Sequence, residues 1–148
     1  MPRILVTGSR SWTDREAVFR ALNQVCVDHG WMVEPDEYGN TVPRGDVVVV
    51  HGGAQGADTM ADDWVAGSIV RTEVYRYPSL LGNAGGPLRN RYMVGLGADV
   101  VLAFFDLDSR DRGRLSRGTS NCVLEAVKFR IPVRRFYADR VPDWMRVG

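Results

Sequence analysis

A glycine-rich segment has the residue types of an anion-binding turn. Residues 51–58 read HGGAQGAD and directly follow the run Val47–Val50, which is typical of a buried strand. Glycine permits positive φ angles and lets backbone N–H groups approach an anion closely, and a helix that begins there directs its positive end to the same place. The segment therefore predicts a phosphate-binding loop or, without a ligand, a tight turn between a strand and a helix. Its candidate binding residues are Gly52, Gly53, Ala54 and Gly56.

This loop matches neither of two common nucleotide-binding motifs. A Walker A loop would continue with Lys and then Ser or Thr, and a dinucleotide fingerprint would read GxGxxG. Asp58 stands in the first turn of the predicted helix. Its carboxylate either only complements the helix dipole or, because it repels phosphate, faces ribose hydroxyls or a base. We take Asp58 as a candidate for sugar recognition.

Three further segments have residues that bind anions. They read GSR at residues 8–10, PLRNR at residues 87–91 and RGTSN at residues 117–121. An arginine fork binds phosphate or carboxylate through two parallel hydrogen bonds, and a helix start presents free N–H groups. The alternatives are surface ion pairs for the arginines and a plain helix cap for Thr119 or Ser120. The candidate binding residues are Gly8, Ser9, Arg10, Arg89, Asn90, Arg91, Arg117, Gly118, Thr119 and Ser120.

Apolar runs and helical patterns alternate along the chain. Short apolar runs without polar interruptions indicate strands that are buried on both faces, as in a parallel sheet. The predicted strands are Ile4–Val6, Val47–Val50, Val70–Tyr77, Val100–Phe104 and Pro132–Phe136. The order predicts an α/β fold: a single Rossmann-like domain over residues 1–148, with a doubly wound, mostly parallel sheet flanked by helices. Loops after parallel strands meet at the carboxyl edge, so the four segments should converge on one crevice near the switch point between the first and fourth strands.

Four helices connect these strands. Thr13 and Glu16 have the spacing of a capping box at the start of the first helix, and the second helix follows the glycine-rich loop. The third begins at Pro87, a favourable first helical position, and the fourth runs from around Thr119 to about Arg130. Residues 31–45 break the alternation, and their YGN turn predicts either a small hairpin or a surface insertion.

Composition narrows the function classes. The net charge is +1, which gives no overall field that would attract DNA or a membrane, although RDRGRLSR at residues 110–117 gathers four arginines. Cys26 and Cys122 are the only cysteines, and this favours a reducing compartment over a disulfide framework. With two histidines and no CxxC motif, we expect no metal and no cofactor. Because no signal peptide or long apolar run is present, we expect a cytoplasmic protein.

The succession of motifs closely resembles the DUF2493 family, also called YspA-like, within the SLOG superfamily of Rossmann-like nucleotide-binding domains. The resemblance covers roughly residues 3–136 and rests on VTGSRSWTD, HGGAQGAD, GNAGGPLRNRYM, ADVVLAF and RGTSN. It implies a Rossmann-like sheet that binds a nucleotide or a nucleotide-derived ligand, in a family that is frequent in phage genomes. It also implies a homodimer, since the superfamily commonly dimerises.

The LOG enzymes of that superfamily suggest an alternative. They hydrolyse the N-glycosidic bond of nucleoside monophosphates with an arginine four residues before a methionine, a spacing that Arg89 and Met93 match. Their acid stands three residues after the threonine of a glycine-threonine pair, and here that position is Cys122. The nearest carboxylate is Glu125, three residues further on, and Asp58, Asp106 or Asp108 could instead supply the acid from elsewhere.

A second relative, DprA, binds single-stranded DNA and carries PxRNR, which PLRNR matches here. We therefore expect a protein that binds or senses a nucleotide or nucleoside phosphate. Glycosidic hydrolysis, with Arg89 holding the phosphate and Glu125 or Asp58 as the acid, and single-strand binding are the alternatives.

Overall fold

The computed structural model describes residues 2–77 and 79–146, and its centre is a parallel sheet. The five sheet strands are β1 (Arg3–Gly8), β2 (Val48–His51), β3 (Arg71–Val74), β4 (Val100–Phe105) and β7 (Val133–Tyr137), in the order β3-β2-β1-β4-β7. All four neighbouring pairs are parallel. β2 and β4 are buried along their whole length, which explains why their sequences are apolar without alternation.

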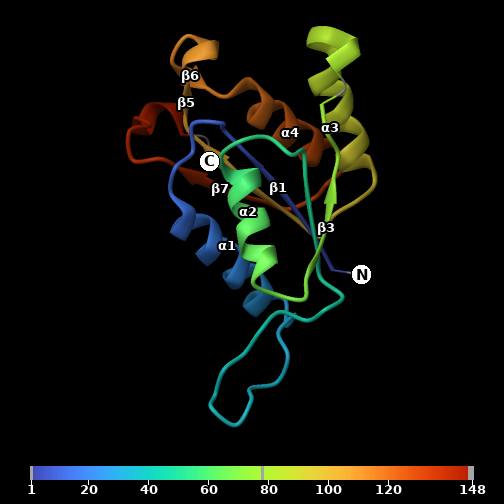
Figure 1. Cartoon of the computed structure of the whole chain (residues 1–148). Helices are drawn as coiled ribbons and strands as arrows, with labels where there is room; N and C mark the ends of the chain where they lie inside the picture. Colours follow the sequence, from blue (N-terminus) through green and yellow to red (C-terminus); the bar gives the residue numbers. More distant parts are fainter. Residues whose placement is uncertain (1, 78, 147–148) are drawn as a thin grey trace.

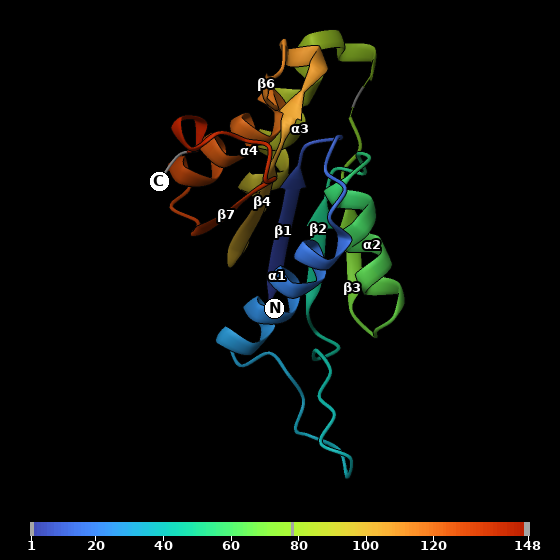
Figure 2. The same cartoon turned by 90° about the vertical axis from the view of Figure 1, so that its left-hand side faces the viewer.

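Helices cover both faces of the sheet (Figures 1 and 2). On one face, α1 (Arg15–Asp28) and α2 (Ala57–Ala66) pack on the side of the sheet to which Ile4 points. On the other, α3 (Gly85–Gly95) and α4 (Arg117–Lys128) pack on the side of Leu5. The side chains of successive residues in a strand point to opposite faces of the sheet, so β1 contributes to both hydrophobic cores. The predicted doubly wound, Rossmann-like α/β fold is confirmed.

Three helix starts differ from the prediction. The N-cap of α1 is Asp14 rather than Thr13, because the Asp14 carboxylate accepts a hydrogen bond from the N–H of Ala17 at 3.0 Å. α3 begins at Gly85, ahead of Pro87, after the 3₁₀ helix η1 (Ser79–Ala84). The N-cap of α4 is Ser116, whose hydroxyl accepts from the N–H of Thr119. Thr119 therefore lies inside the first turn, and its own hydroxyl does not cap the helix.

A small antiparallel hairpin between β4 and α4 was not predicted. It consists of β5 (Leu107–Asp108), the 3₁₀ helix η2 (Ser109–Asp111) and β6 (Arg114–Leu115). The left-handed conformations of Arg112 and Gly113 reverse the chain direction. This hairpin carries the arginine-rich segment to the carboxyl edge of the sheet.

Residues 31–45 form an arm at the other end of the molecule, opposite the β5–β6 hairpin (Figures 1 and 2). Met32 and Pro43 form an isolated antiparallel bridge, and the N–H of Val33 donates to the carbonyl of Val42 at 2.9 Å. The arm is thus a hairpin-like surface insertion, and it lies far from the carboxyl edge. The chain ends with the 3₁₀ helix η3 (Asp143–Met145). No helix within the described residues is long and apolar enough to cross a membrane.

Candidate anion-binding cleft at the carboxyl edge

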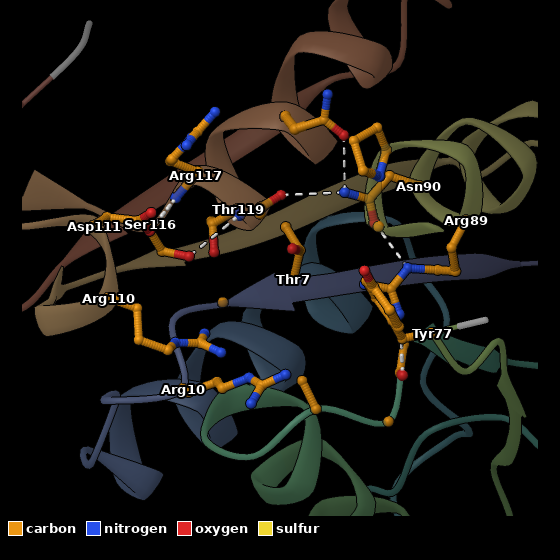
Figure 3. A pocket seen from close by; sticks show the side chains of 18 of the residues that line it. Thr7, Arg10, Tyr77, Arg89, Asn90, Arg110, Asp111, Ser116, Arg117 and Thr119 are labelled. Carbon is orange, nitrogen blue, oxygen red and sulfur yellow. Dashed lines mark hydrogen bonds between the residues drawn. The ribbon is translucent and has the colours of Figure 1, made fainter. Parts of the chain in front are cut away.

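A cleft of about 780 Å³ opens at the carboxyl edge of the sheet (Figure 3). It lies at the switch point, where the connections after β1 and β4 lead to helices on opposite faces. All four predicted segments reach it. The predicted binding residues that line it are Gly8, Arg10, Gly52, Gly53, Ala54, Arg89, Asn90, Arg117, Gly118 and Thr119. The candidates outside its lining are Ser9, Gly56, Asp58, Arg91, Ser120 and Glu125.

The turn between β2 and α2 is closed by its own side chains. Oδ2 of Asp58, which is buried, accepts hydrogen bonds from the N–H groups of Gly52 at 3.1 Å and Ala54 at 3.2 Å. Nδ1 of His51 accepts from the N–H of Gly53 at 2.9 Å. The N–H groups of Gly52, Gly53 and Ala54, which the sequence predicts as phosphate ligands, are therefore already hydrogen-bonded within the turn. The carboxylate of Asp58 faces this backbone, and Asp58 lies outside the cleft lining where a sugar contact was expected.

The same hydrogen bonds determine the protonation state of His51. Because Nδ1 accepts from Gly53, the ring hydrogen is on Nε2, which donates to Oδ1 of Asp62 at 2.6 Å. Nδ1 also lies 4.0 Å from Oδ2 of Asp58, but without a hydrogen this contact is no ion pair. Burial raises the pKa of Asp58 to about 6, although the loop N–H groups and Arg89 oppose the increase. Its Oδ1 has no hydrogen-bond partner among the described residues.

Two glycines allow this turn to pack tightly against the end of β1. Gly56 has φ of 84°, and a Cβ there would overlap the carbonyl oxygen of Ser9. A Cβ at Gly8 would lie 2.6 Å from the Cβ of Ala57. Gly56 therefore has a structural role, in a conformation that side chains rarely adopt. Ser9 is buried against this turn, and its hydroxyl bonds with that of Ser11.

Arg89 lies across the ends of β2 and β3. Its Nη1 donates to the carbonyl oxygens of Gly52 at 3.1 Å and Tyr75 at 3.0 Å, and its Nε donates to Oδ1 of Asn90 at 2.9 Å. Nη2 has no partner within the described residues and remains available to a ligand. A Cβ at Gly52 would overlap Nη1, so glycine at this position permits the close approach. Arg91, two residues on, is exposed outside the cleft.

Asn90 connects this arginine with the start of α4. Its side chain is buried, and Nδ2 donates to the carbonyl of Gly118 at 3.2 Å and to Oδ1 of Asn121 at 2.9 Å. Because Oδ1 of Asn90 accepts the bond from Arg89, both the oxygen and the nitrogen of this amide are hydrogen-bonded. Asn90 therefore orients Arg89 relative to α4.

The first turn of α4 contains a buried hydroxyl that donates no hydrogen bond to the described residues. Oγ1 of Thr119, a residue that is 1% exposed, lines the cleft and has no hydrogen-bond partner in the described part of the chain. The N–H of Arg117 donates to Asp111 at 2.9 Å, and that of Thr119 donates to Ser116 at a long 3.5 Å. A buried hydroxyl without a partner costs free energy, and the helix dipole favours an anion here. Ser120 is exposed and points away from the lining.

The charge of the lining is strongly positive. It includes five arginines and one carboxylate, and these residues are Arg10, Arg76, Arg89, Arg110, Arg117 and Asp111. Of the arginines, only Arg110 has an ion pair within the described residues, at 3.2 Å from Asp108, which lies outside the cleft lining. Arg10 and Arg76 donate no hydrogen bond to the described residues. The cleft therefore attracts anions although the whole chain carries almost no net charge.

The predicted hydrolytic residues are not assembled. Glu125 is buried on α4 outside the cleft, and its Oε1 lies 3.4 Å from Nζ of Lys128. At the position of the LOG acid, burial raises the pKa of the Cys122 thiol to about 12, so it is neither an acid nor a nucleophile near neutral pH. Asp106, directly before the hairpin, and Asp108, in β5, are buried and pair with Arg140 and Arg110. Asp111, the carboxylate of the lining, accepts from the backbone of Arg117.

Several lining residues escaped the sequence prediction. They are Thr7, Arg76, Tyr77, Gly86, Pro87, Arg110, Asp111, Ser116 and Asn121. Tyr77 and Arg76 were assigned to a strand over Val70–Tyr77, but β3 ends at Val74 and the following residues turn into the cleft. An arginine-tyrosine pair directly after a strand was a usable signal. In the described part of the chain, no cluster of three or more His, Cys, Asp or Glu side chains is suited to a metal.

Comparison with known proteins gives one informative relative. None of the protein-family models matches the chain. The Gene 61 protein of Mycobacterium phage D29 is 42% identical to it over 144 residues, an alignment that covers 92% of this chain and 97% of the phage protein. Identity at this level over nearly the full length of both proteins shows common descent, and the chain therefore belongs to the family of the phage D29 Gene 61 protein.

Proposed function

We propose that the cleft binds a nucleotide or another nucleoside phosphate, the function that the DUF2493 and SLOG resemblance implies. The observation that carries this proposal is the hydroxyl of Thr119, which is buried, lines the cleft and has no partner in the described structure. A phosphate oxygen at this position would accept its hydrogen. The helix dipole of α4 favours the same negative charge, and the free Nη2 of Arg89 adds positive charge elsewhere in the cleft.

This proposal places the phosphate at α4 and not on the glycine-rich turn after β2. The N–H groups of Gly52, Gly53 and Ala54 are bonded to Asp58 and His51. A phosphate that used them would have to break those bonds. The start of α4 requires no such exchange, because Thr119 has an unused hydroxyl there.

The nucleoside part of the ligand has a suitable neighbour in Tyr77. Its side chain lines the cleft, is 42% exposed, and lies on the same side of Thr7 as Arg89 in Figure 3. Every base has a π face that stacks on such a ring. Tyr77 therefore supports a nucleoside phosphate over a simple inorganic anion.

Binding is favoured over hydrolysis of the N-glycosidic bond. Such hydrolysis needs a carboxyl group at the sugar carbon that reacts. Glu125 and Asp58, the candidates for this acid, both lie outside the lining, and the charge of Asp58 is directed at backbone N–H groups. We propose that the protein binds or senses its ligand without cleaving it.

A panel of nucleotides tests this function. We expect at least one nucleoside phosphate to raise the melting temperature and to bind in isothermal titration calorimetry, and we expect no free base after long incubation. No binding by any member of the panel would contradict the proposal. Release of base that is lost in Glu125→Gln or Asp58→Asn would instead favour the hydrolase.

A matched pair of variants tests the role of the hydroxyl. Thr119→Val keeps the shape of the side chain and removes an unpartnered buried hydroxyl, so the free protein should be at least as stable as the wild type. Its affinity for the nucleotide should fall roughly tenfold to a hundredfold, since one hydrogen bond to a charged group contributes about 1.5–3 kcal/mol. Thr119→Ser should retain most of the affinity. Equal binding by all three proteins would exclude a ligand contact at Thr119.

We further propose that two copies of the chain associate through an apolar stripe on α3 and α4. Leu88, Tyr92 and Leu96 recur at helical spacing, and with Leu124 and Val127 on the adjacent helix they are between 45% and 61% exposed. Side chains of this size on one face usually mark an interface. Sedimentation should show a dimer that Tyr92→Glu converts to a folded monomer. A monomeric wild-type protein at micromolar concentration would refute this association.

A further inference from the structure

The arginines of the cleft form two groups on opposite sides of Thr7. Figure 3 shows Arg10 and Arg110 together on one side of Thr7, with Arg117 of α4 on the same side, and Arg89 on the other. Arg76 belongs with Arg89. The guanidinium of Arg76 lies next to Gly53, and Arg89 donates to the carbonyl of the preceding residue, Gly52. The positive charge is thus divided.

The sheet sets the separation between the two groups. Arg89 is bonded to Gly52 and Tyr75, the residues that directly follow β2 and β3. Arg10 and Arg110 follow β1 and β5 instead, and both border one shallow hollow with Leu107, just beyond β4. In the order β3-β2-β1-β4, the two positions are two strand spacings apart, or roughly 9–10 Å.

The group at Arg10 and Arg110 is held by the β5–β6 hairpin that follows β4. The hydroxyl of Ser11 donates to the carbonyl of Leu107 at 2.8 Å and ties the β1–α1 connection to this hairpin. Nη2 of Arg110 donates to Oδ2 of Asp108 at 3.2 Å. This bond fixes the arginine side chain and leaves its Nη1 free for a ligand. Arg10 donates to none of the described residues. Two guanidinium groups held on one side of a cleft are an anion subsite of their own.

A phosphate bound at Arg89 leaves Arg10 and Arg110, anchored two strand spacings away along the sheet, available for a second phosphate. The phosphates of a 5′-diphosphate share a bridging oxygen and are close together, so they suit separated subsites poorly. Phosphates on the 5′ and 3′ oxygens of one nucleoside lie on either side of the ribose and fit two separated subsites. We infer that the ligand is a nucleoside with phosphate esters on both its 5′ and 3′ oxygens, either as a free 3′,5′-bisphosphate or within a short oligonucleotide. This inference rests on the proposed function, since it assigns the second phosphate of the same ligand.

Calorimetric titration of the full chain with matched nucleotides tests the inference. The probes are the 5′-monophosphate, 3′-monophosphate, 5′-diphosphate and 3′,5′-bisphosphate of adenosine, guanosine, cytidine and uridine. For the preferred base, we expect the 3′,5′-bisphosphate to bind at least tenfold more tightly than the other three. A 5′-diphosphate or monophosphate that binds within threefold of it would overturn the inference while leaving the proposed function intact. If no probe binds, both fail.

A dinucleotide with a 5′-phosphate distinguishes the two sources of this chemistry. Tighter binding of the free bisphosphate identifies a small molecule, and equal or tighter binding of the dinucleotide identifies an oligonucleotide. Both results support two phosphate subsites. Weaker binding of both compounds than of the 5′-monophosphate would overturn the inference.

Variants of the outer group supply the decisive comparison. Arg10→Gln and Arg110→Gln should each remove most of the tenfold advantage of the bisphosphate, while one of the two monophosphates binds with unchanged affinity. Arg114→Gln, on the same hairpin but outside the cleft, should bind every probe within twofold of the wild type. All three side chains are exposed, so these changes leave the fold intact. An equal loss for all probes in Arg10→Gln would show a general charge effect and contradict a separate subsite.

Discussion

Two connections from a strand to a helix face the same cleft, yet they treat their polar groups in opposite ways. The turn before α2 is rich in glycine, and Asp58 and His51 accept hydrogen bonds from three of its N–H groups. The first turn of α4 has a long hydrogen bond at its cap and leaves the hydroxyl of Thr119 unused. Among the described residues, the turn before α2 leaves only an acceptor, Oδ1 of Asp58, without a partner, whereas α4 leaves a donor that an anion can use.

This difference shows what a glycine-rich turn does and does not reveal. Glycine is needed where backbone segments approach closely, and Gly56 meets the backbone of Ser9 while Gly52 meets Arg89. Both contacts are internal to the protein. The signal for an anionic ligand is an unsatisfied hydrogen-bond donor beside a positive helix end, and Thr119 supplies it here, whereas the unpartnered atom of Asp58 is an acceptor.

Replacing one glycine in each turn with alanine should give the largest contrast. Gly56→Ala places a Cβ against the carbonyl of Ser9 at φ of 84°, so we expect a loss of about 4 kcal/mol in the free energy of unfolding. Gly118→Ala meets nothing nearer than 3.9 Å in a helical turn and should add about 0.5 kcal/mol. Urea denaturation measures both. Similar stabilities for the two variants would contradict the packing difference between the turns.

The second prediction concerns the carboxylate that closes the turn before α2. Its pKa of about 6 in the native state lies above the usual 3.8, so between these pH values the native protein keeps a proton that the unfolded chain has lost. Asp58 therefore contributes stability that is present below pH 4 and is lost as the pH rises through 6. The change amounts to about 3 kcal/mol, at 1.36 kcal/mol for each pKa unit.

Asp58→Asn isolates this contribution because asparagine keeps an acceptor for the N–H groups and does not titrate. The difference in unfolding free energy between wild type and variant should change by about 3 kcal/mol between pH 4 and pH 7, with the wild type relatively more stable at pH 4. Taking the difference removes the contribution of the other acids. A difference that is independent of pH would show that Asp58 is not buried as a charge.

The fold was predictable because its strands are buried on both faces. Val47–Val50 and Val100–Phe104 have no polar interruption, and only a strand inside a parallel sheet requires this. The β5–β6 hairpin was not predictable, since strands of two residues have no periodicity. Its position depends on tertiary contacts such as the bond between Ser11 and Leu107.

The location of the cleft was predictable from the sequence, but the hydrogen-bonding role of each residue in it was not. The rule that parallel strands end at one edge correctly brought Gly8, Gly52, Arg89 and Thr119 together. Sequence position could not show that the carboxylate of Asp58 turns back to accept from Gly52, because that depends on the path of the folded turn. Local hydrogen bonding decides which groups remain for a ligand.

The third prediction separates two arginines of one helix. Arg89→Gln removes the free Nη2 and should lower the affinity for the preferred nucleotide by about 1.5–3 kcal/mol, or roughly tenfold to a hundredfold. Arg91→Gln removes an equal charge outside the cleft and should change the affinity by about twofold or less. Titration at one ionic strength measures both. Equal losses would mean that overall charge, and not the geometry around Gly52, attracts the ligand.

The smallest effect is expected at Cys122, which lies in α4 three residues after Thr119. The side chain is fully buried and burial raises the pKa of its thiol to about 12, so an aromatic disulfide reagent should not react with it in the folded protein at pH 8. Cys122→Ala should leave nucleotide affinity within about twofold, because the ligand meets Thr119 and not the thiol below it, although the lost volume costs some stability. Loss of binding on this substitution, or rapid labelling of the native protein, would mean that the floor of the cleft opens. The unsatisfied hydroxyl of Thr119 would then not be the feature that distinguishes the turn before α4 from the turn before α2.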